Sequence, residues 1–387
     1  MRYLTAGESH GKALVGILEG IPAGLRLTAE DIDAQLQRRK LGLGRGERQK
    51  IEADAVELLS GVRHGSTLGS PIALLIRNLD ANDWDHVMQA EPWTGDVERQ
   101  VTAPRPGHAD LAGGLKYGHR DMRNVLERSS ARETAMRVAL GTVARRMLDA
   151  CGVSIASRVT AVGGIQDPTP VDVAVEELNA RVDASPLRCL GADAEAQMVA
   201  EVGRCKEEGD SLGGEFEVLA SGVPLGLGSH VHWDRRLDGE IGRHFLSLNG
   251  VKGVEIGLGF RLAHVRGSAA HDELLPGSKP GKVRFCSNRS GGVAGGITTG
   301  QTLIVRAAMK PISTLMTPLR SVRLSSNEPA SAHVERADVC AVPAAAVIGE
   351  SLLALVLAEA MLVKFGGDSM DELLPRVKAW NEEESPE

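Results

Sequence analysis

The stretch that decides the fold is AVPAAAVIGESLLALVLAEAMLVKF, residues 341–365, which is apolar for most of its length. Pro343 suits the first turn of a helix, and Gly366 and Gly367 follow where that helix would stop. Glu350 lies in mid-span, where a carboxylate in a bilayer would cost a few kcal/mol, about 2.5 or more for Asp. We therefore expect a buried core helix and no association with a membrane.

The composition is that of a globular protein with a large core, because 42% of the 387 residues are hydrophobic and 25% are charged. Length alone predicts two or more domains. The five cysteines are scattered without a Cys-x-x-Cys spacing, which argues against a disulfide framework and a metal site. The first residues lack a basic stretch followed by an apolar run, so we expect a cytoplasmic protein. The net charge of -7 disfavours nucleic acid as a partner.

Capping signals and periodicity predict a mixed α and β chain. Thr28 and Asp31 can form a capping box for a helix that ends near Lys40. Ser130 and Glu133 form a full Ser-x-x-Glu pattern before a helix that ends near residue 151. Further helices are expected at 171–182, 193–208 and 237–248, strands at 13–18, 72–76, 215–219, 254–258 and 302–306, and a short flexible tail at 381–387.

The chain contains a short internal sequence repeat. EGIPAGL at residues 19–25 resembles SGVPLGL at 221–227, and each follows an expected strand and precedes a segment with helical pattern. More faintly, residues 69–77 match residues 300–306. This pattern favours a pseudo-duplicated fold, in which a length typical of two domains forms one closed architecture.

Two histidines stand beside glycines in expected loops. His10 lies in GESHG, residues 7–11, where an opening strand runs into a turn, and His108 lies in PRPGHAD, residues 104–110. Loops next to glycine allow backbone and ligand to approach closely, and histidine exchanges protons near neutrality. Both are candidates for acid–base catalysis, although most of the 11 histidines need have no such role. A pair between Ser9 and His10 is disfavoured, because neighbours on an extended segment point to opposite faces.

Positive charge is concentrated between residues 38 and 50, where glycines separate six basic side chains and only Glu47 offsets them. The six are Arg38, Arg39, Lys40, Arg45, Arg48 and Lys50. Arg outnumbers Lys by 33 to 11 in the chain, and its guanidinium fork matches phosphate and carboxylate geometry. No aromatic residue accompanies the cluster, which favours a small polyanion over RNA. A solvated basic loop after a helix is the alternative.

A second candidate anion site is the helix start in LERSSARET, residues 126–134. The first turn of a helix leaves backbone N–H groups unpaired and suits phosphate. A serine there could simply cap the helix, but Arg128 and Arg132 flank the turn and favour an anion site. KPIST at 310–314 and ERAD at 335–338 are weaker candidates.

Together these segments resemble the chorismate synthase family, from Met1 to about Lys364. The most specific stretches are GESHG at 7–11 with GIP at 20–22, ERSSARET at 127–134, and RAD at 336–338 followed by ES at 350–351. The resemblance implies the α+β chorismate synthase fold, a single-domain β-α-β sandwich over residues 1–387 that assembles as a homotetramer. This fold suits the internal repeat, which we place at roughly 1–150 and 210–365.

The family resemblance implies a lyase of the shikimate pathway of aromatic amino acid biosynthesis. Its reaction is the 1,4-anti elimination of phosphate from 5-enolpyruvylshikimate 3-phosphate, which gives chorismate and requires reduced FMN without net redox change. We expect the flavin to be reduced by an external, NADPH-dependent reductase, since no extra insertion is evident. The segment 269–282 is rich in Gly, Pro and charge and is expected to act as a lid.

The resemblance also assigns roles to individual residues. His10 would stabilise or protonate the reduced flavin, His108 would protonate the departing phosphate, and Asp338 would help a flavin nitrogen accept the substrate proton. The implied substrate-binding residues are Arg39, Arg45 and Arg48, with Arg132 and Arg336 as weaker candidates. The implied flavin-binding residues are Arg128, Ser129, Ser130, Asn249, Gly250, Gly295, Lys310, Pro311, Ile312, Ser313, Thr314 and Arg336. The Asp338 site departs from the family at Ala337, often Ser or His, and at Val339, where Pro is common.

Two other classes of protein stay open. One is a different phosphate-handling flavoprotein or a kinase-like transferase, but the glycine-rich segment 290–296 lacks the Gly-Lys-Ser/Thr of a Walker loop. The other is an RNA-binding protein that uses residues 38–50, which the acidic total charge and the missing aromatic residues disfavour.

Overall fold

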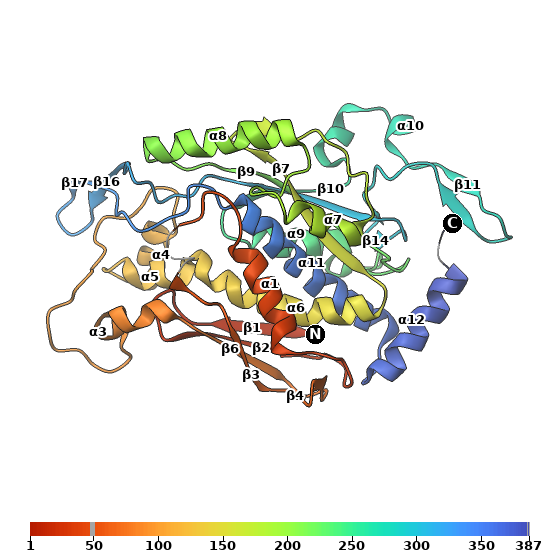
Figure 1. Ribbon diagram of the computed structural model, residues 1–387, viewed down its shortest axis with the longest axis horizontal. Helices are drawn as coiled ribbons and strands as arrows, with labels where there is room; N and C mark the ends of the chain where they lie inside the picture. Colours follow the sequence, from red (N-terminus) through yellow and green to blue (C-terminus); the bar gives the residue numbers. More distant parts are fainter. Residues whose placement is uncertain (47–50, 385, 387) are drawn as a thin grey trace.

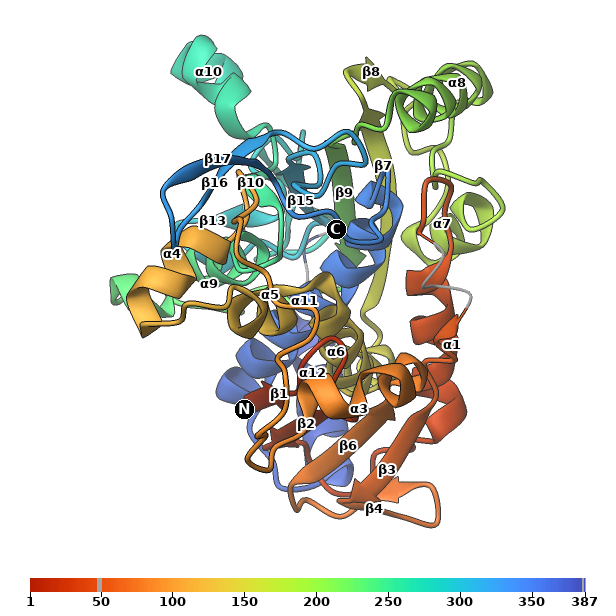
Figure 2. The ribbon, with the colours of Figure 1, turned by 90° about the vertical axis from the view of Figure 1, so that its left-hand side faces the viewer.

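The computed structural model describes residues 1–46, 51–384 and 386 and contains two main antiparallel sheets (Figures 1 and 2). The first has the order β1-β2-β6-β3 and the second the order β10-β15-β9-β7-β8. Their strands are β1 Arg2–Ala6, β2 Ala13–Glu19, β6 Ile72–Arg77, β3 Val56–Ser60, β10 Val251–Ile256, β15 Leu303–Met309, β9 Gly214–Ser221, β7 Ser154–Val162 and β8 Ile165–Gln166.

A layer of helices separates the two sheets, and its centre is α11, Val342–Phe365. This helix packs against α6, Thr134–Ala150, on one side and against strands of the second sheet on the other. Gly141 of α6 permits the close approach, because a Cβ there would lie 2.4 Å from Cβ of Ser351. The prediction of a buried core helix is confirmed. Within the described part of the chain only α11 is long and apolar enough to cross a membrane, and 78% of its most apolar window is buried.

The two sheets repeat one topology, as the pseudo-duplicated fold requires. The order β1-β2-β6-β3 corresponds strand by strand to β7-β9-β15-β10, and the crossing helices α6 and α11 follow β6 and β15 in the chain. The second repeat therefore begins at β7, earlier than the expected residue 210. Its first strand is separated from β9 by an insertion that contains β8, α7 Val175–Val182 and α8 Ala192–Glu208.

The similar sequences at residues 19–25 and 221–227 form the same hydrogen-bond pattern. The Thr67 hydroxyl donates to the Pro22 carbonyl over 2.6 Å and accepts the N–H of Leu25 over 2.9 Å. In the second repeat the Thr298 hydroxyl donates to Pro224 over 2.6 Å and accepts from Leu227 over 2.8 Å. A pattern recognised in the sequence thus marks the same turn in both halves.

Most predicted elements occur, with shifted boundaries. The capping box of Thr28 and Asp31 forms at α1, Ala29–Lys40. At Ser130 only half of the predicted box forms: its hydroxyl accepts the Arg132 N–H before the 3-10 turn η2, Ala131–Glu133, whereas Glu133 pairs with Arg137 of α6. The helix predicted at 171–182 begins only at 175, and the helix at 237–248 is α9, Leu237–Leu246.

The remaining elements are short or peripheral. They are β4 Val62–Arg63, β5 Ser66–Thr67, η1 Leu79–Trp84, α3 Asp85–Met88, α4 Asp110–Tyr117, α5 Arg123–Ser129, η3 Trp233–Arg235, η4 Gly259–His264, α10 Gly267–Ala270, β11 Leu274–Pro276, β12 Val283–Phe285, β13 Val293–Ala294, β14 Ile297–Thr298, β16 Arg320–Arg323, β17 Glu328–Ser331 and α12 Met370–Glu384. The strands β3 and β7 and the helices α4, α5 and α12 were not predicted from the sequence. Because α12 runs through residue 384, the first four residues of the expected tail at 381–387 are helical.

Candidate active site

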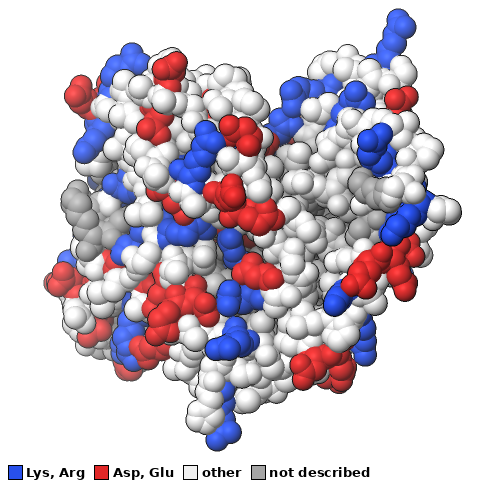
Figure 3. All heavy atoms as spheres, turned by 45° about the vertical axis from the view of Figure 1, so that its right-hand side comes forward, with Lys and Arg blue, Asp and Glu red and all other residues white. Residues whose placement is uncertain are grey.

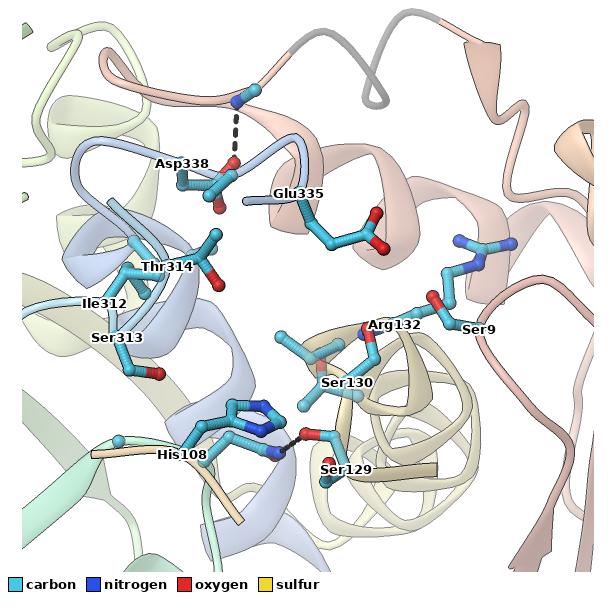
Figure 4. A pocket seen from close by; sticks show the side chains of 18 of the residues that line it. Ser9, His108, Ser129, Ser130, Arg132, Ile312, Ser313, Thr314, Glu335 and Asp338 are labelled. Carbon is cyan, nitrogen blue, oxygen red and sulfur yellow. Dashed lines mark hydrogen bonds between the residues drawn. The ribbon is translucent and has the colours of Figure 1, made fainter. Parts of the chain in front are cut away.

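A cavity of about 380 Å³ lies where segments from both repeats meet. Its wall combines the turn after β1, the end of α1, the loop before α4, the junction of α5 and α6, the end of β15 and the first turns of α11. Figure 4 shows His108 and Ser129 on one side of the open space, with Asp338 and Glu335 on another. Segments that are far apart in the sequence thus form one site.

The cavity wall has an apolar part and a charged part. Leu126, Leu248, Met309, Ile312 and Ile348 supply the apolar part. Among the described lining residues, six are cationic and three are acidic: Arg39, Arg45, Arg105, Arg132, Lys310 and Arg336 against Glu52, Glu335 and Asp338. Figure 3 shows acidic and basic side chains mixed over one outer face of the molecule. The excess of cations in the cavity suits an anionic ligand. The apolar part of the wall can contact a flat apolar group of that ligand.

His10 lines the cavity from the turn between β1 and β2. This turn depends on Gly7, whose φ is +109° and where a Cβ would lie 2.4 Å from the Ala13 carbonyl oxygen. The His10 Nδ1 atom lies 2.9 Å from a carboxylate oxygen of Glu127, and its ring stacks on Trp84 with centroids 3.9 Å apart. The imidazole is therefore held on one edge and one face.

His108 lies two residues before the buried side chain of Asp110. Its Nδ1 is 2.5 Å from Asp110 Oδ1, and Arg105 donates through Nε to the other oxygen of that carboxylate over 2.8 Å. The Arg105 Nη1 group also donates to the Thr314 hydroxyl over 2.8 Å. In Figure 4 the His108 ring faces the open space. The two histidines predicted for acid–base chemistry thus lie in one cavity.

Arg39 and Arg132 form a buried ion-pair cluster in the wall of the cavity. Both contact the carboxylate of Asp54, and Arg132 also lies 3.4 Å from Glu52. Arg39 donates further to Thr134 over 3.1 Å. Burial lowers the pKa of Arg39 to about 10, although Asp54 opposes the shift, so the guanidinium stays charged at neutral pH. A ligand anion would therefore share these arginines with protein carboxylates.

The second group of predicted residues centres on Asp338. This carboxylate lies 3.1 Å from the Arg45 guanidinium and accepts the Gly46 N–H over 2.6 Å. Val339 stands where proline is common in the family, and the structure gives a reason. The Val339 N–H donates to the Gly44 carbonyl over 2.7 Å, which a proline could not do. The structure shows no comparable contact that explains Ala337. Arg48 lies outside the described residues.

Arg336 approaches the cavity from the same loop as Asp338. Its guanidinium donates to Asp80 over 2.7 Å, and the same Asp80 oxygen lies 3.8 Å from His10 Nε2. Arg336 is thus connected to His10 through one carboxylate. The predicted substrate ligands Arg39, Arg45, Arg132 and Arg336 all line one cavity.

Most of the predicted flavin-binding residues lie on the side of the cavity that His108 occupies. Ser129, Ser130, Asn249, Gly250 and the run 310–314 line it. The Asn249 amide donates to the Ser129 carbonyl over 2.9 Å. Its buried Oδ1 has no hydrogen-bond partner among the described residues, so an acceptor remains for a ligand. Burial and the nearby charge of Lys252 lower the pKa of Lys310.

Two residues and one segment that were predicted for the site do not line this cavity. Arg128 points away, donating to Thr5 and to the Gly7 carbonyl, and lines a separate hollow beside the cavity. Gly295 lies in the turn between β13 and β14 and does not line the cavity. The adjacent Gly296 carbonyl accepts the N–H of Leu237 at the start of α9, whereas the cavity is lined by Leu248, which follows the end of that helix. The expected lid, 269–282, forms the arm with β11 at the opposite end of Figure 1 from α4 and α5, so it does not cover this cavity.

The acidic residues that bind the candidate histidines and arginines were not predicted from the sequence. Glu127 and Asp110 hold the two histidines, and Asp54 holds two arginines. Glu127 and Asp110 lie inside the quoted motifs, so their position beside candidate residues was a usable signal. Asp54 carries no local signal, because its partners come from other parts of the chain.

Two histidines, an excess of cations and an apolar wall in one cavity are typical of an enzyme that binds a small anionic substrate. The family model for chorismate synthase matches residues 1–362. "Chorismate synthase 1" of a Bacillus cereus strain is 51% identical over 386 residues, covering 99% of each chain, and the chorismate synthase of Desulforudis audaxviator is 55% identical over 374 residues, covering 97% of this chain and 95% of its own. A solved structure titled "Crystal Structure of Chorismate Synthase" is 41% identical with a TM-score of 0.79, covering 99% of this chain and 98% of its own. The chain belongs to the chorismate synthase family, and it is therefore a lyase of aromatic amino acid biosynthesis.

Proposed function

We propose that this cavity carries out the 1,4-anti elimination of phosphate from 5-enolpyruvylshikimate 3-phosphate, which gives chorismate. The observation that carries the proposal is the meeting of two carboxylate-bound histidines and an excess of cations in one cavity. The substrate offers a phosphate and two carboxylates to such a site. In the elimination the C–O bond to phosphate breaks and its electron pair leaves with the phosphate. At the far end of the allylic system a C–H bond breaks, its proton leaves, and its electron pair forms a new C=C bond while the existing double bond shifts.

The cavity fits reduced FMN by the chemistry of its wall. Aliphatic side chains can cover a flat ring system, while the unpaired Asn249 Oδ1 accepts one hydrogen bond and Lys310, Ser313 and Thr314 offer donors to a phosphate or ring carbonyl. When bound, reduced FMN supplies the electron-rich surface that this elimination requires, and the reaction has no net redox change. We propose that an external, NADPH-dependent reductase keeps the flavin reduced.

In this proposal the chain supplies protons and holds charge. His108 donates a proton to an oxygen of the departing phosphate, and Lys310, whose ammonium lies 2.8 Å from the Gly107 carbonyl beside it, attracts that anion. Arg45, Arg132 and Arg336 orient the substrate, and their carboxylate partners keep the guanidinium groups fixed.

His10 and Asp338 have separate roles in the proposed reaction. His10 would stabilise or protonate reduced FMN, and Trp84 and Glu127 hold its imidazole in place. Asp338 assists removal of the substrate proton. Its carboxylate also fixes the Arg45 loop, so substitution of Asp338 should weaken substrate binding as well as turnover.

The first prediction concerns the reaction itself. Anaerobic mixing of the protein with 5-enolpyruvylshikimate 3-phosphate and chemically reduced FMN should yield chorismate and phosphate in equal amounts, whereas oxidised FMN should yield neither. Phosphate release and the absorbance of chorismate measure this. NADPH with FMN but without a reductase should give no product, and product in that mixture would contradict the proposed external reductase only. Absence of product with reduced FMN would contradict the proposed function.

We also propose a single folded domain that assembles as a cytoplasmic homotetramer. The helix α6 covers the inner face of the sheet β1-β2-β6-β3, and on its outer face Leu4 lies directly opposite Ile17, with the two residues 75% and 44% exposed. Val15 pairs with Leu75 on the same face. An apolar sheet face of this kind is typical of a subunit contact.

The second prediction tests this assembly. Ile17→Lys places a charge in the proposed contact and should reduce the tetramer to dimers or monomers, measured by light scattering. Val363→Lys is the matched control, because Val363 is 79% exposed on α11 and lies outside this sheet. An unchanged mass for Ile17→Lys would show that the outer sheet face is not a subunit contact.

A further inference from the structure

The two site histidines share one arrangement that their assigned roles do not explain. Each presents Nδ1 to a buried carboxylate, and each carboxylate is bound by a buried arginine. We propose that Asp110 and Glu127 are positioning residues that fix the tautomer and the orientation of His108 and His10. This inference rests on the proposed proton-transfer roles of the two histidines.

The His108 half of the arrangement is compact. Asp110 has no exposed surface, and its Oδ1 lies 2.5 Å from Nδ1 of His108. Arg105 binds this carboxylate through its backbone N–H and its Nε, at 3.1 and 2.8 Å, and its Nη2 lies 3.1 Å from Oδ1. The same Nη2 atom lies 3.0 Å from Nδ1 and 3.2 Å from Nε2 of His108, so Asp110 and Arg105 are the charged groups against the ring, with Lys310 close to the preceding residue.

The His10 half uses different parts of the chain. The carboxylate of Glu127 lies 2.9 and 3.0 Å from Nδ1 of His10 and also accepts its backbone N–H over 2.8 Å. Arg123, one helical turn earlier on α5, donates to Glu127 over 3.0 Å. The ring also lies near Asp80 and stacks on Trp84.

The chemistry of a carboxylate explains what such a pair does. An ionised carboxylate only accepts hydrogen bonds, so the nitrogen that faces it must carry a hydrogen. Hydrogen bonds from the histidines and arginines lower the pKa of both Asp110 and Glu127 in spite of their burial, which keeps them ionised. Nδ1 is therefore the donor to the carboxylate, and Nε2 is the atom that gives up or takes a proton.

The proton transfer at His108 then balances without a proton on Asp110. The Nε2–H bond of the imidazolium breaks and an O–H bond forms on the departing phosphate, while Nδ1–H stays in its hydrogen bond. The carboxylate stabilises the cation before the transfer and holds the ring during it. His108 and Asp110 are two residues apart in the sequence, whereas His10 and Glu127 are 117 apart. The two histidine–carboxylate pairs are therefore not copies of one local motif.

Asp110→Asn tests the inference, because it keeps the shape of the side chain but places an amide against Nδ1. The expected result is a loss of about 10- to 100-fold in the single-turnover rate of chorismate formation, with little change in KM or FMN affinity. The pH dependence of that rate should also change, because the partner of Nδ1 is no longer an anion. Asp110→Glu restores the charge and should recover part of the rate. Asp167→Asn is the matched control, since Asp167 is a buried carboxylate that accepts backbone N–H groups of residues 190 and 191.

A second pair of variants keeps the test decisive if Asp110→Asn does not fold. Glu127→Gln should lower the rate in the same way, whereas Glu217→Gln breaks a buried pair with Arg158 in the second sheet and should not. If His108→Ala is impaired but both positioning variants match their controls in rate and pH profile, the inference is overturned and the proposed function stands. If His108→Ala and His10→Ala react normally, the proposed proton-transfer roles fail instead.

Discussion

His108→Ala should lower kcat by about 10²- to 10⁴-fold, because the departing phosphate loses the group that protonates it. The structure favours this result by placing the imidazole in the wall of the cavity that Lys310 also lines and by fixing its orientation through Asp110. FMN affinity should change little. Steady-state assays with reduced FMN and a flavin-binding titration measure the two quantities separately.

His10→Ala should cause a loss in the same range, but with a different signature. Its ring stacks on Trp84 and is bound by Glu127, so the variant loses a fixed imidazole that is proposed to stabilise or protonate the reduced flavin. His232→Ala is the control for both variants, because His232 is half exposed beside η3 and does not line the cavity. Rates near that of the control would remove the proton-transfer role from whichever histidine showed them.

The core of the fold could be predicted from local signals in the sequence. The apolar run at 341–365 with its flanking proline and glycines leaves little alternative to a buried helix, and the repeated Gly-x-Pro turns mark both halves of the fold. Strands such as β7 escaped recognition because both faces of that strand are buried, so it lacks a clean alternation.

The site was predictable only in part. Histidines and arginines in glycine-rich motifs can be recognised in the sequence, and those that the structure describes line the cavity apart from Arg38 and Arg128. Their carboxylate partners depend on tertiary contacts, since Asp54 meets Arg132 across 78 residues and Glu127 meets His10 across 117. Arg39 and Arg132 looked like free cations in the sequence, and the structure shows them in ion pairs.

The second large expected effect is a loss of stability when Glu350 is replaced. This carboxylate is 1% exposed, and it accepts hydrogen bonds from Arg38 at 2.8 Å, Arg145 at 2.5 Å and Arg188 at 3.3 Å. The Ser157 hydroxyl adds a bond of 2.6 Å. These partners come from α1, α6, β7 and the insertion that follows it, so one side chain on α11 joins both repeats.

Glu350→Gln should lower the free energy of unfolding by about 3–5 kcal/mol, because it leaves buried guanidinium groups without their shared anion. Glu359→Gln on the same helix is the control and should change it by about 0.5 kcal/mol or less, since Glu359 is half exposed. Urea unfolding at one fixed protein concentration, followed by circular dichroism, measures both. A single transition is expected in each case, because the core residues of the two repeats form one continuous cluster.

The pH dependence of unfolding gives an independent check on Glu350. Burial would raise its pKa, but the charges of Arg38 and Arg145 outweigh burial and hold the pKa well below the ordinary value of 4.5. A carboxyl group whose pKa is lowered by folding stabilises the protein fully above its unfolded pKa, and this contribution is lost as the pH falls toward the folded value. The stability difference between the unmodified protein and Glu350→Gln should therefore be constant from about pH 6 to 8 and shrink below about pH 4.5. A difference that stayed constant down to the acid-unfolding limit would mean that the charge of Glu350 does not stabilise the fold.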